Sequence, residues 1–115
     1  MLFIEYPKCT TCQKAKKWLD ENGLTYIERN IKTDNPTYEE LKAWLAISNL
    51  PLRRFFNTSG LLYKSMELKE KLPFMSEDEQ LRLLATDGML VKRPIIVTEN
   101  LVLVGFKAVE WAKLK

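Results

Sequence analysis

The chain has 115 residues, of which 46% are hydrophobic and 29% are charged, and its formal net charge is +3. This balance is typical of one folded, soluble domain and excludes a disordered chain, and no apolar run reaches the roughly 18 residues of a membrane span. Histidine is absent and cysteine occurs twice, which excludes Ser-His-Asp and Cys-His nucleophiles and leaves too few ligands for a zinc site within one chain.

The first 31 residues predict a strand, a helix and a second strand. Residues 2–4 form a short apolar run that ends in a Tyr-Pro loop, as a buried strand does. From Thr11 the apolar residues recur at helical spacing until the Asn-Gly pair at 22–23, and residues 25–31 then alternate between apolar and polar. A βαβ unit of this length has a right-handed crossover, so its two strands should be parallel.

The middle of the chain, about residues 37–88, is expected to be a helical insert. Residues 37–40 and 76–79 each have the sequence of a capping box, in which Thr or Ser precedes Glu by three positions and opens a helix. A further short helix is expected around residues 66–71, stopped by Pro73.

The last 22 residues predict a hairpin and a closing helix. Residues 94–98 and 101–104 are rich in β-branched side chains, and the two residues between them indicate an antiparallel connection. Gly105 should end the second strand, and residues 108–114 can form a helix. The order βαβ, helical insert, ββα predicts one α/β domain over residues 1–115, with a thioredoxin-like fold and a four-stranded mixed sheet.

Cys9 and Cys12 lie after the first strand, at the start of the first helix. Free N–H groups and the positive end of the helix dipole favour a thiolate there, and Lys8, Lys14 and Lys16 add positive potential. Helix starts and Cys-X-X-Cys spacing lower a thiol pKa from about 8.5 to between roughly 3.5 and 7.5. We expect Cys9 to be the exposed nucleophile and Cys12 to attack the mixed disulfide that it forms.

Three other interpretations of the cysteines stay open. They can form a structural disulfide, although so short a loop restrains little chain entropy. They can supply half of a zinc site that a second chain completes, or they can be inert core residues. A Cys-X-X-Cys motif beside a βαβ pattern is itself a redox signature, and this favours thiol–disulfide chemistry.

The Arg93-Pro94 pair is the second candidate feature. Proline is allowed at the first residue of a strand because it need not donate a ladder hydrogen bond. In a thioredoxin-like fold Pro94 would be cis and lie beside the cysteine loop, so that Arg93 can hold an anionic substrate group or stabilise the Cys9 thiolate. Without that fold, a surface arginine before a strand is nearly as good an interpretation. Arg53 and Arg54 with Asn57 form either an anion pocket or a solvated helix end.

Several motifs resemble the ArsC/Spx family, which comprises arsenate reductases and redox-sensing regulators. They are Tyr-Pro-Lys-Cys-Thr-Thr-Cys-Gln-Lys-Ala at 6–15, Glu-Arg-Asn-Ile at 28–31, Arg-Pro-Ile-Ile-Val at 93–97 and Val-Gly at 104–105. The resemblance covers nearly the whole chain and implies a thioredoxin-like fold with a helical insert. It implies a thiol–disulfide oxidoreductase. The predicted catalytic residues are Cys9, Cys12, Arg93 and Pro94, and the predicted substrate-binding residues are Lys8, Thr10, Thr11 and Asn57.

The same resemblance implies an arsenate reductase-like protein rather than a true arsenate reductase. Glutaredoxin-coupled arsenate reductases use one nucleophilic cysteine, here Cys9, and three arginines around the oxyanion. Arg93 matches one of them, whereas Asn57 and Gly105 stand at the positions of the other two. Bidentate guanidinium contacts supply much of the affinity for an oxyanion, so true arsenate reduction is not expected.

The alternative function is an Spx-like redox-sensing transcription regulator. That branch also carries Cys-X-X-Cys and ends its last strand in glycine, and it binds the C-terminal domain of the RNA polymerase α subunit. This chain ends at Lys115 without the branch's longer basic tail, and it has no arginine near Thr58 to match the one in the Spx insert. We therefore rank the regulator second.

Partners and location follow from charge and from the resemblance. Basic and acidic residues are interleaved, so no direct nucleic-acid partner is expected, and no membrane partner either. Residues 1–5 have no basic segment before their apolar run, so no signal peptide and a cytoplasmic location are expected. The expected partner is a thiol reductant or a protein client. No bound cofactor or metal is expected, and glutathione, glutaredoxin and thioredoxin are candidate reductants.

Overall fold

A mixed four-stranded sheet forms the centre of the computed structural model, which describes residues 1–115. Its strands lie in the order β2-β1-β3-β4, with bounds β1 Leu2–Glu5, β2 Ile27–Asn30, β3 Ile95–Val97 and β4 Val102–Val104. β1 and β2 are parallel, whereas β1 and β3, and β3 and β4, are antiparallel. The βαβ unit, the C-terminal hairpin and the four-stranded mixed sheet of a thioredoxin-like fold are therefore confirmed.

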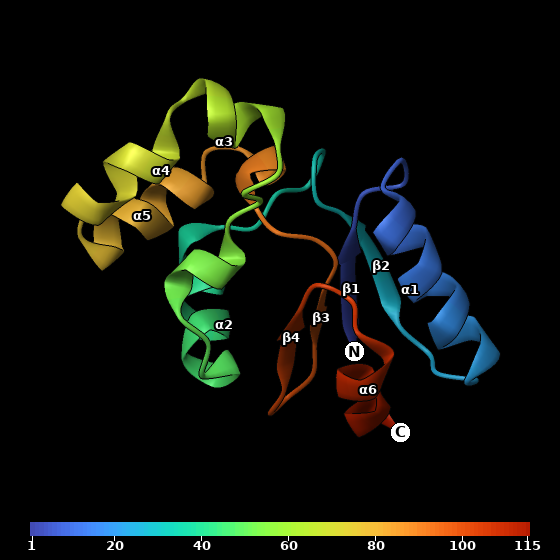
Figure 1. Cartoon of the computed structure of the whole chain (residues 1–115). Coiled ribbons are helices and arrows are strands. Elements are labelled where there is room, and N and C mark those ends of the chain that lie inside the picture. The colour runs from blue at the N-terminus through green and yellow to red at the C-terminus, as the bar shows by residue number, and fades with distance from the viewer.

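Six α-helices and four 3-10 turns complete the chain, and Figure 1 shows their arrangement around the sheet. The helices are α1 Thr10–Glu21, α2 Tyr38–Ser48, α3 Leu61–Ser65, α4 Leu68–Lys71, α5 Glu77–Leu84 and α6 Ala108–Trp111. The 3-10 turns are η1 Leu52–Phe55, η2 Leu72–Phe74, η3 Gly88–Leu90 and η4 Ala112–Leu114. None of the helices is long and apolar enough to cross a bilayer.

Two hydrophobic cores lie on opposite faces of the sheet. Side chains alternate along β1, so Phe3 and Ile4 point to different faces. Phe3 packs with residues of α1 and α6, among them Leu19 and Trp111. Ile4 packs with residues of α2 and of the rest of the helical insert, among them Trp44. Figure 1 shows this division, with α1 and α6 on one side of the sheet and α2 on the other.

Both predicted capping boxes are present, and the first also ties the insert to the sheet. The Thr37 hydroxyl accepts a hydrogen bond from the Glu40 N–H at 3.1 Å, and the Glu40 carboxylate accepts one from the Thr37 N–H at 3.0 Å. The same carboxylate accepts two bonds from Arg29 on β2, at 2.6 and 2.8 Å. These bonds from Arg29 lower the pKa of Glu40 to about 2, against the effect of partial burial.

The two ends of the insert are joined by backbone hydrogen bonds. Phe56 and Val91 form an isolated antiparallel bridge. The Asn57 N–H donates to the Leu90 carbonyl, and the Lys92 N–H donates to the Phe55 carbonyl, each at 2.8 Å. The chain therefore leaves the sheet region and returns to it at neighbouring points.

The short helix predicted around residues 66–71 is present as α4, which ends at Lys71. A helix that was not predicted, α3, precedes it, and the two are separated at Glu67, whose φ of 55° lies in the left-handed region. Pro73 lies inside η2, which follows α4 directly. Proline fits there because the first turn of a helix leaves its N–H groups unbonded.

Two further positions depend on tertiary context. Ile27 on the edge strand β2 is 72% exposed, although the alternating pattern placed it among the apolar residues of a strand. Gly88, the last residue of the predicted insert, lies directly against the residue that follows β2, because a Cβ there would be 1.7 Å from the Ile31 carbonyl oxygen. No side chain fits at that contact.

Candidate functional site

The Cys-X-X-Cys motif begins where β1 ends and α1 starts. Cys9 is the N-cap of α1, and its sulfur accepts a hydrogen bond from the Cys12 N–H at 3.4 Å. The Cys9 N–H donates to the Tyr6 carbonyl at 2.9 Å, which fixes the loop that joins strand and helix. Both thiols are free, and Cys9 is partly exposed whereas Cys12 is fully buried. A partner can therefore reach Cys9 first.

The environments of the two thiols shift their pKa values in opposite directions. Burial opposes the charged form of Cys9, but hydrogen bonds from the Cys12 side chain and backbone, together with Arg93, lower the pKa of the Cys9 thiol below its ordinary value. Burial, together with the neighbouring Cys9 and Glu5, raises the pKa of Cys12 to about 12, against the lowering effect of a hydrogen bond with the Tyr6 backbone. The exposed sulfur is thus the one that ionises more easily.

Arg93 lies beside Cys9 and contacts an aromatic ring. Its guanidinium contributes to the lowered pKa of Cys9, and its Cζ lies 5.2 Å from the centroid of the Tyr6 ring. One nitrogen, Nη1, is buried and has no hydrogen-bond partner. The Arg93–Pro94 peptide bond is cis, and Pro94 is buried at the start of β3. Arg93 therefore has a donor available for an anionic group near the Cys9 sulfur.

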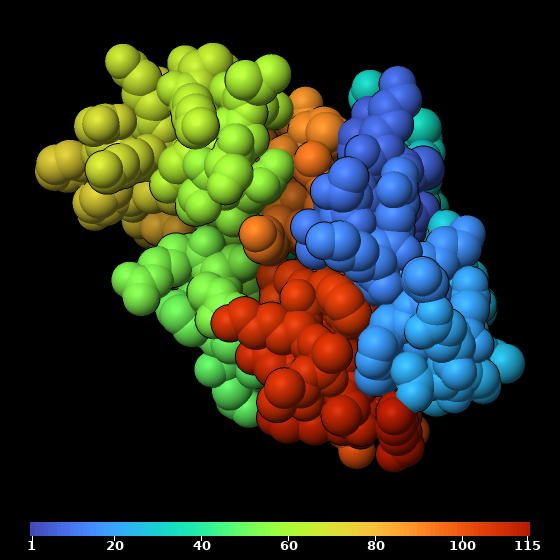
Figure 2. Space-filling model, turned by 45° about the vertical axis from the view of Figure 1, so that its right-hand side comes forward, coloured from blue at the N-terminus to red at the C-terminus, as the bar shows by residue number.

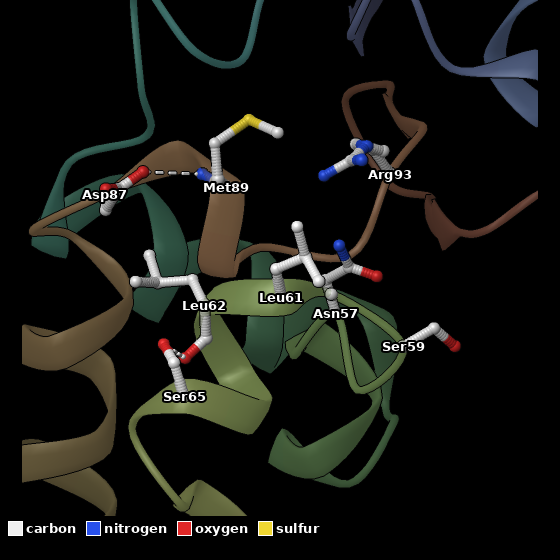
Figure 3. Close-up of a pocket in the computed structure, with 9 residues that line it drawn as sticks. Asn57, Ser59, Leu61, Leu62, Ser65, Asp87, Met89 and Arg93 are labelled. Carbon is white, nitrogen blue, oxygen red and sulfur yellow. Dashed lines mark hydrogen bonds between the residues drawn. The ribbon is translucent and has the colours of Figure 1, made fainter.

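A cavity of about 760 Å³ opens on the insert side of Arg93. Arg93 and Asn57 both line it, and Figure 3 shows them on the same side of the cavity, with Leu61, Leu62 and Met89 around the rest. The structure brings Asn57 and Arg93 together, although they are far apart in the sequence. The lining joins one guanidinium, one amide, two serine hydroxyls and the Asp87 carboxylate to three apolar side chains. A carboxylate repels an oxyanion, so the cavity suits an organic group better than a small oxyanion.

The other predicted substrate-binding residues do not share this cavity. Thr11 is exposed and lines a different cavity, beside Lys92 and Gly105. Lys8 and Thr10 are exposed and line none of the cavities. The predicted substrate-binding residues therefore lie in at least two separate places around the cysteine loop.

Glu5 is a buried acidic residue that the sequence analysis did not single out. It is 4% exposed at the end of β1, and because side chains alternate it shares the sheet face of Phe3, which α1 covers. Burial and the nearby Glu28 together raise the pKa of Glu5 to about 7, against the opposing effect of Lys16. The one available signal was a carboxylate inside an otherwise apolar strand.

No group of three or more His, Cys, Asp and Glu side chains is placed to hold a metal ion. The reactive groups that the structure places here are the two thiols, the Arg93 guanidinium and the Glu5 carboxyl, with the cavities beside them.

Comparisons with known proteins agree on one family. A model of the ArsC family matches residues 4–114. YusI of Bacillus subtilis (strain 168) is 56% identical over 107 residues, which is 93% of this chain and 91% of YusI. The global transcriptional regulator Spx 1 of Bacillus cereus is 35% identical over 101 residues, 87% of this chain and 75% of that protein. The crystal structure of an ArsC family related protein from Bacteroides fragilis superposes with a TM-score of 0.98 at 63% identity, covering 99% of this chain and 96% of the other.

Proposed function

The chain belongs to the ArsC family, and from that premise we propose that it is a cytoplasmic thiol–disulfide oxidoreductase. The observation that carries this proposal is the arrangement of the two free thiols. Cys9 is partly exposed at the N-cap of α1 with a lowered pKa, and Cys12 is buried one turn behind it, close enough for its N–H to bond the Cys9 sulfur at 3.4 Å.

The proposed reaction has two exchange steps. The Cys9 thiolate attacks a disulfide of the client, forms a mixed disulfide, and releases one client thiolate, which takes up a proton. Cys12 then loses its proton and attacks the Cys9 sulfur, which forms the Cys9–Cys12 disulfide and releases the second client thiol. The client gains two electrons and the protein loses two. A thiol reductant of the glutathione, glutaredoxin or thioredoxin class would restore both thiols.

The second step is helped by the first. In the resting protein the Cys9 charge is among the causes that raise the pKa of Cys12. Once Cys9 is in a mixed disulfide it carries no charge, so the pKa of Cys12 falls and a larger fraction of Cys12 is present as thiolate. The buried thiol thus stays protonated until the nucleophile has reacted.

Arg93 and Pro94 would shape the groove in which the client disulfide lies. Arg93 supplies the free Nη1 donor beside Cys9, and Pro94 is buried directly after it. Asn57 supports an organic client over arsenate, because it lines the cavity with Arg93 where an oxyanion site would need a second guanidinium.

Trapping tests the proposal. In Cys12→Ser the second step cannot occur, so the mixed disulfide on Cys9 should persist and be recovered from cell extract by a thiol-free pull-down. Cys9→Ser is the matched control and should recover nothing. In the wild type, mass spectrometry after mild peroxide should show a loss of two hydrogens and a Cys9–Cys12 linked peptide. Failure to form that bond would overturn the dithiol mechanism.

A redox-responsive regulator is the second candidate, and the 35% identity to Spx 1 is the observation that favours it. In this case the redox state of the Cys9–Cys12 pair would control binding to the C-terminal domain of the RNA polymerase α subunit, and the pair would not reduce a client. A pull-down with that domain, using reduced and oxidised protein, tests it. Equal absence of binding in both redox states would remove the regulator.

A further inference from the structure

A positively charged cleft, separate from the cavity of Asn57 and Arg93, lies beside the start of α1. It is defined here by two adjoining cavities of about 320 and 310 Å³, which share Arg54 and Lys92. The first also has Thr11 and Lys107 in its wall, and the second has Arg53. Figure 2 shows how four separate chain segments meet on this face: green near residue 54, orange near 92, the blue start of α1 and the red residues after β4.

The four cations of the cleft have no acidic partners. The ion pairs of the protein are formed by Lys16, Lys17, Arg29 and Arg82, all outside the cleft. Neither cavity has an aspartate or glutamate in its wall. Unpaired charges of one sign in a concave surface produce a focused positive potential, which attracts anions to the site.

Gly105 keeps the cleft open next to the motif. Its φ of 78° favours glycine, and the atom nearest to a Cβ built there is the Lys92 Cε at 3.6 Å. The Lys92 side chain therefore passes over Gly105, which has no side chain of its own. Thr11, two residues after Cys9 in the motif, lies in the same wall, which places the cleft next to the cysteine motif.

We propose that the cleft formed by Arg54, Lys92 and Lys107 beside Thr11 binds the anionic groups of a low-molecular-weight disulfide that is a substrate of Cys9. This inference rests on the proposed dithiol function and names its substrate class. Guanidinium and ammonium groups recognise carboxylates and phosphates alike, and two adjoining cavities suit a ligand that carries at least two anionic groups. A neutral disulfide would gain nothing from the cleft.

The reaction uses the same two exchanges. Cys9 attacks one sulfur of the small disulfide and releases one anionic thiol. Cys12 then displaces the second, so one disulfide gives two thiols while the protein gains the Cys9–Cys12 bond. Electrostatic attraction in the cleft should act on the first step, because that step brings the two molecules together.

Charge reversal with matched substrates tests the cleft. We would measure the second-order rate constant for oxidation of the reduced protein by glutathione disulfide, by coenzyme A disulfide and by neutral hydroxyethyl disulfide. Arg54→Glu and Lys107→Glu should each slow at least one anionic substrate by about tenfold and leave the neutral one within about twofold. Lys71→Glu, an exposed lysine of α4 outside the cleft, changes the net charge equally and should leave all three rates unchanged.

The two anionic substrates identify the group that is bound. A loss of rate confined to glutathione disulfide would show that the cleft binds carboxylates. A loss of rate confined to coenzyme A disulfide would show that it binds phosphates. Equal losses for neutral and anionic substrates, or no loss at all, would overturn the cleft as a binding site. An equal loss in Lys71→Glu would overturn it too, because it would show a general effect of net charge.

A binding experiment separates the cleft from the dithiol chemistry. Cys9→Ser cannot react, so titration with S-methylglutathione and with coenzyme A reports binding alone. At least one should shift the backbone NMR signals of Thr11 and Gly105, with saturation below roughly 10 mM, and Arg54→Glu should abolish the shifts. The absence of shifts with both ligands would contradict binding at the cleft. If the wild type fails to react even with the neutral disulfide while these shifts occur, the proposed dithiol function fails and the cleft stands.

Discussion

The guanidinium carbon of Arg93 lies 5.2 Å from the centre of the Tyr6 ring. The carbonyl of the same tyrosine accepts a hydrogen bond from the Cys9 N–H at 2.9 Å, so one residue holds both the Cys9 backbone and the cation beside it. A cation over an aromatic face gains about 0.5–1 kcal/mol or more, which favours one position of a long side chain over its alternatives. Arg93 is thereby kept where it lowers the pKa of Cys9.

Replacing Arg93 should therefore weaken the nucleophile. In Arg93→Gln the positive charge beside Cys9 is lost, its pKa rises toward the ordinary value, and less thiolate is present at neutral pH. We expect the rate of alkylation by iodoacetamide at pH 7 to fall by roughly 3–10-fold, since each pKa unit changes the thiolate fraction by up to about tenfold. The full pH–rate curve should move to higher pH.

Lys8→Gln is the control for that experiment, because Lys8 is an exposed cation next to Cys9 in sequence. Its alkylation curve should stay close to that of the wild type. Equal shifts for the two variants would show that general positive potential, rather than the Arg93 contact, sets the reactivity of Cys9.

Glu5 should make the protein less stable as the pH rises. Its pKa is about 7 in the folded state against an ordinary value of 4.5, so between those pH values the folded protein keeps a proton that the unfolded chain has lost. The free energy of unfolding then falls across this window, by at most about 3 kcal/mol, and levels off above it. Urea unfolding at pH 5 and pH 8 measures the difference.

Glu5→Gln should flatten that dependence, because an amide does not ionise. Glu99→Gln, at an exposed residue of the hairpin loop, should keep the wild-type pH dependence. An unchanged slope in Glu5→Gln would mean that another group causes it.

Gly88 and Gly23 form a matched pair for the packing of the insert. A Cβ at Gly88 would lie 1.7 Å from the Ile31 carbonyl oxygen, so Gly88→Ala must push the backbone apart and should cost roughly 3 kcal/mol or more. Gly23 has a φ of 66° but nothing within 4 Å, so Gly23→Ala should cost only about 1 kcal/mol. Thermal or urea unfolding of both variants compares the two effects. Similar losses would contradict the close contact at Gly88.

Arg29 should matter more for stability than the charged pairs on the surface. It donates two bonds to Glu40 and further bonds to the carbonyls of Asp34 and Asn35. Lysine cannot reproduce this fork, so Arg29→Lys should lower the free energy of unfolding by about 1–3 kcal/mol. Lys17→Gln breaks an exposed pair with Glu21 and should cost less than about 0.5 kcal/mol. Equal costs would show that the Arg29 contacts add nothing.

Local rules were enough to predict most elements of this fold. The capping boxes, the Asn-Gly stop of α1 and the hairpin all depend on residues within a few positions of one another, and the structure contains each of them. The failures are at positions where distant residues decide. Ile27 is exposed because β2 is an edge strand. The break between α3 and α4 depends on the left-handed backbone of Glu67, which no sequence pattern predicts.

The candidate site divides in the same way. The place of Cys9 and Cys12 at a helix start follows from the sequence, as does the position of Arg93 before β3. The meeting of Asn57 with Arg93 and the burial of Glu5 depend on how the strands pair, so no local pattern contains them. No local sequence pattern predicts the cleft, because its cations come from three separate segments of the chain.

The backbone bonds that join Phe55 to Lys92 and Asn57 to Leu90 have a consequence for how such a protein can change. They pin the two ends of residues 57–90 together, so the entropic cost of closing this excursion depends only weakly on how many residues it contains. Changes of length at its exposed turns therefore leave these anchoring bonds in place, whereas its buried leucines and Gly88 must keep their contacts with Ile4 and Ile31. Because the segment also supplies Asn57 and Leu61 to the wall facing Arg93, substitutions at these two wall positions would redirect the choice of client without touching either thiol.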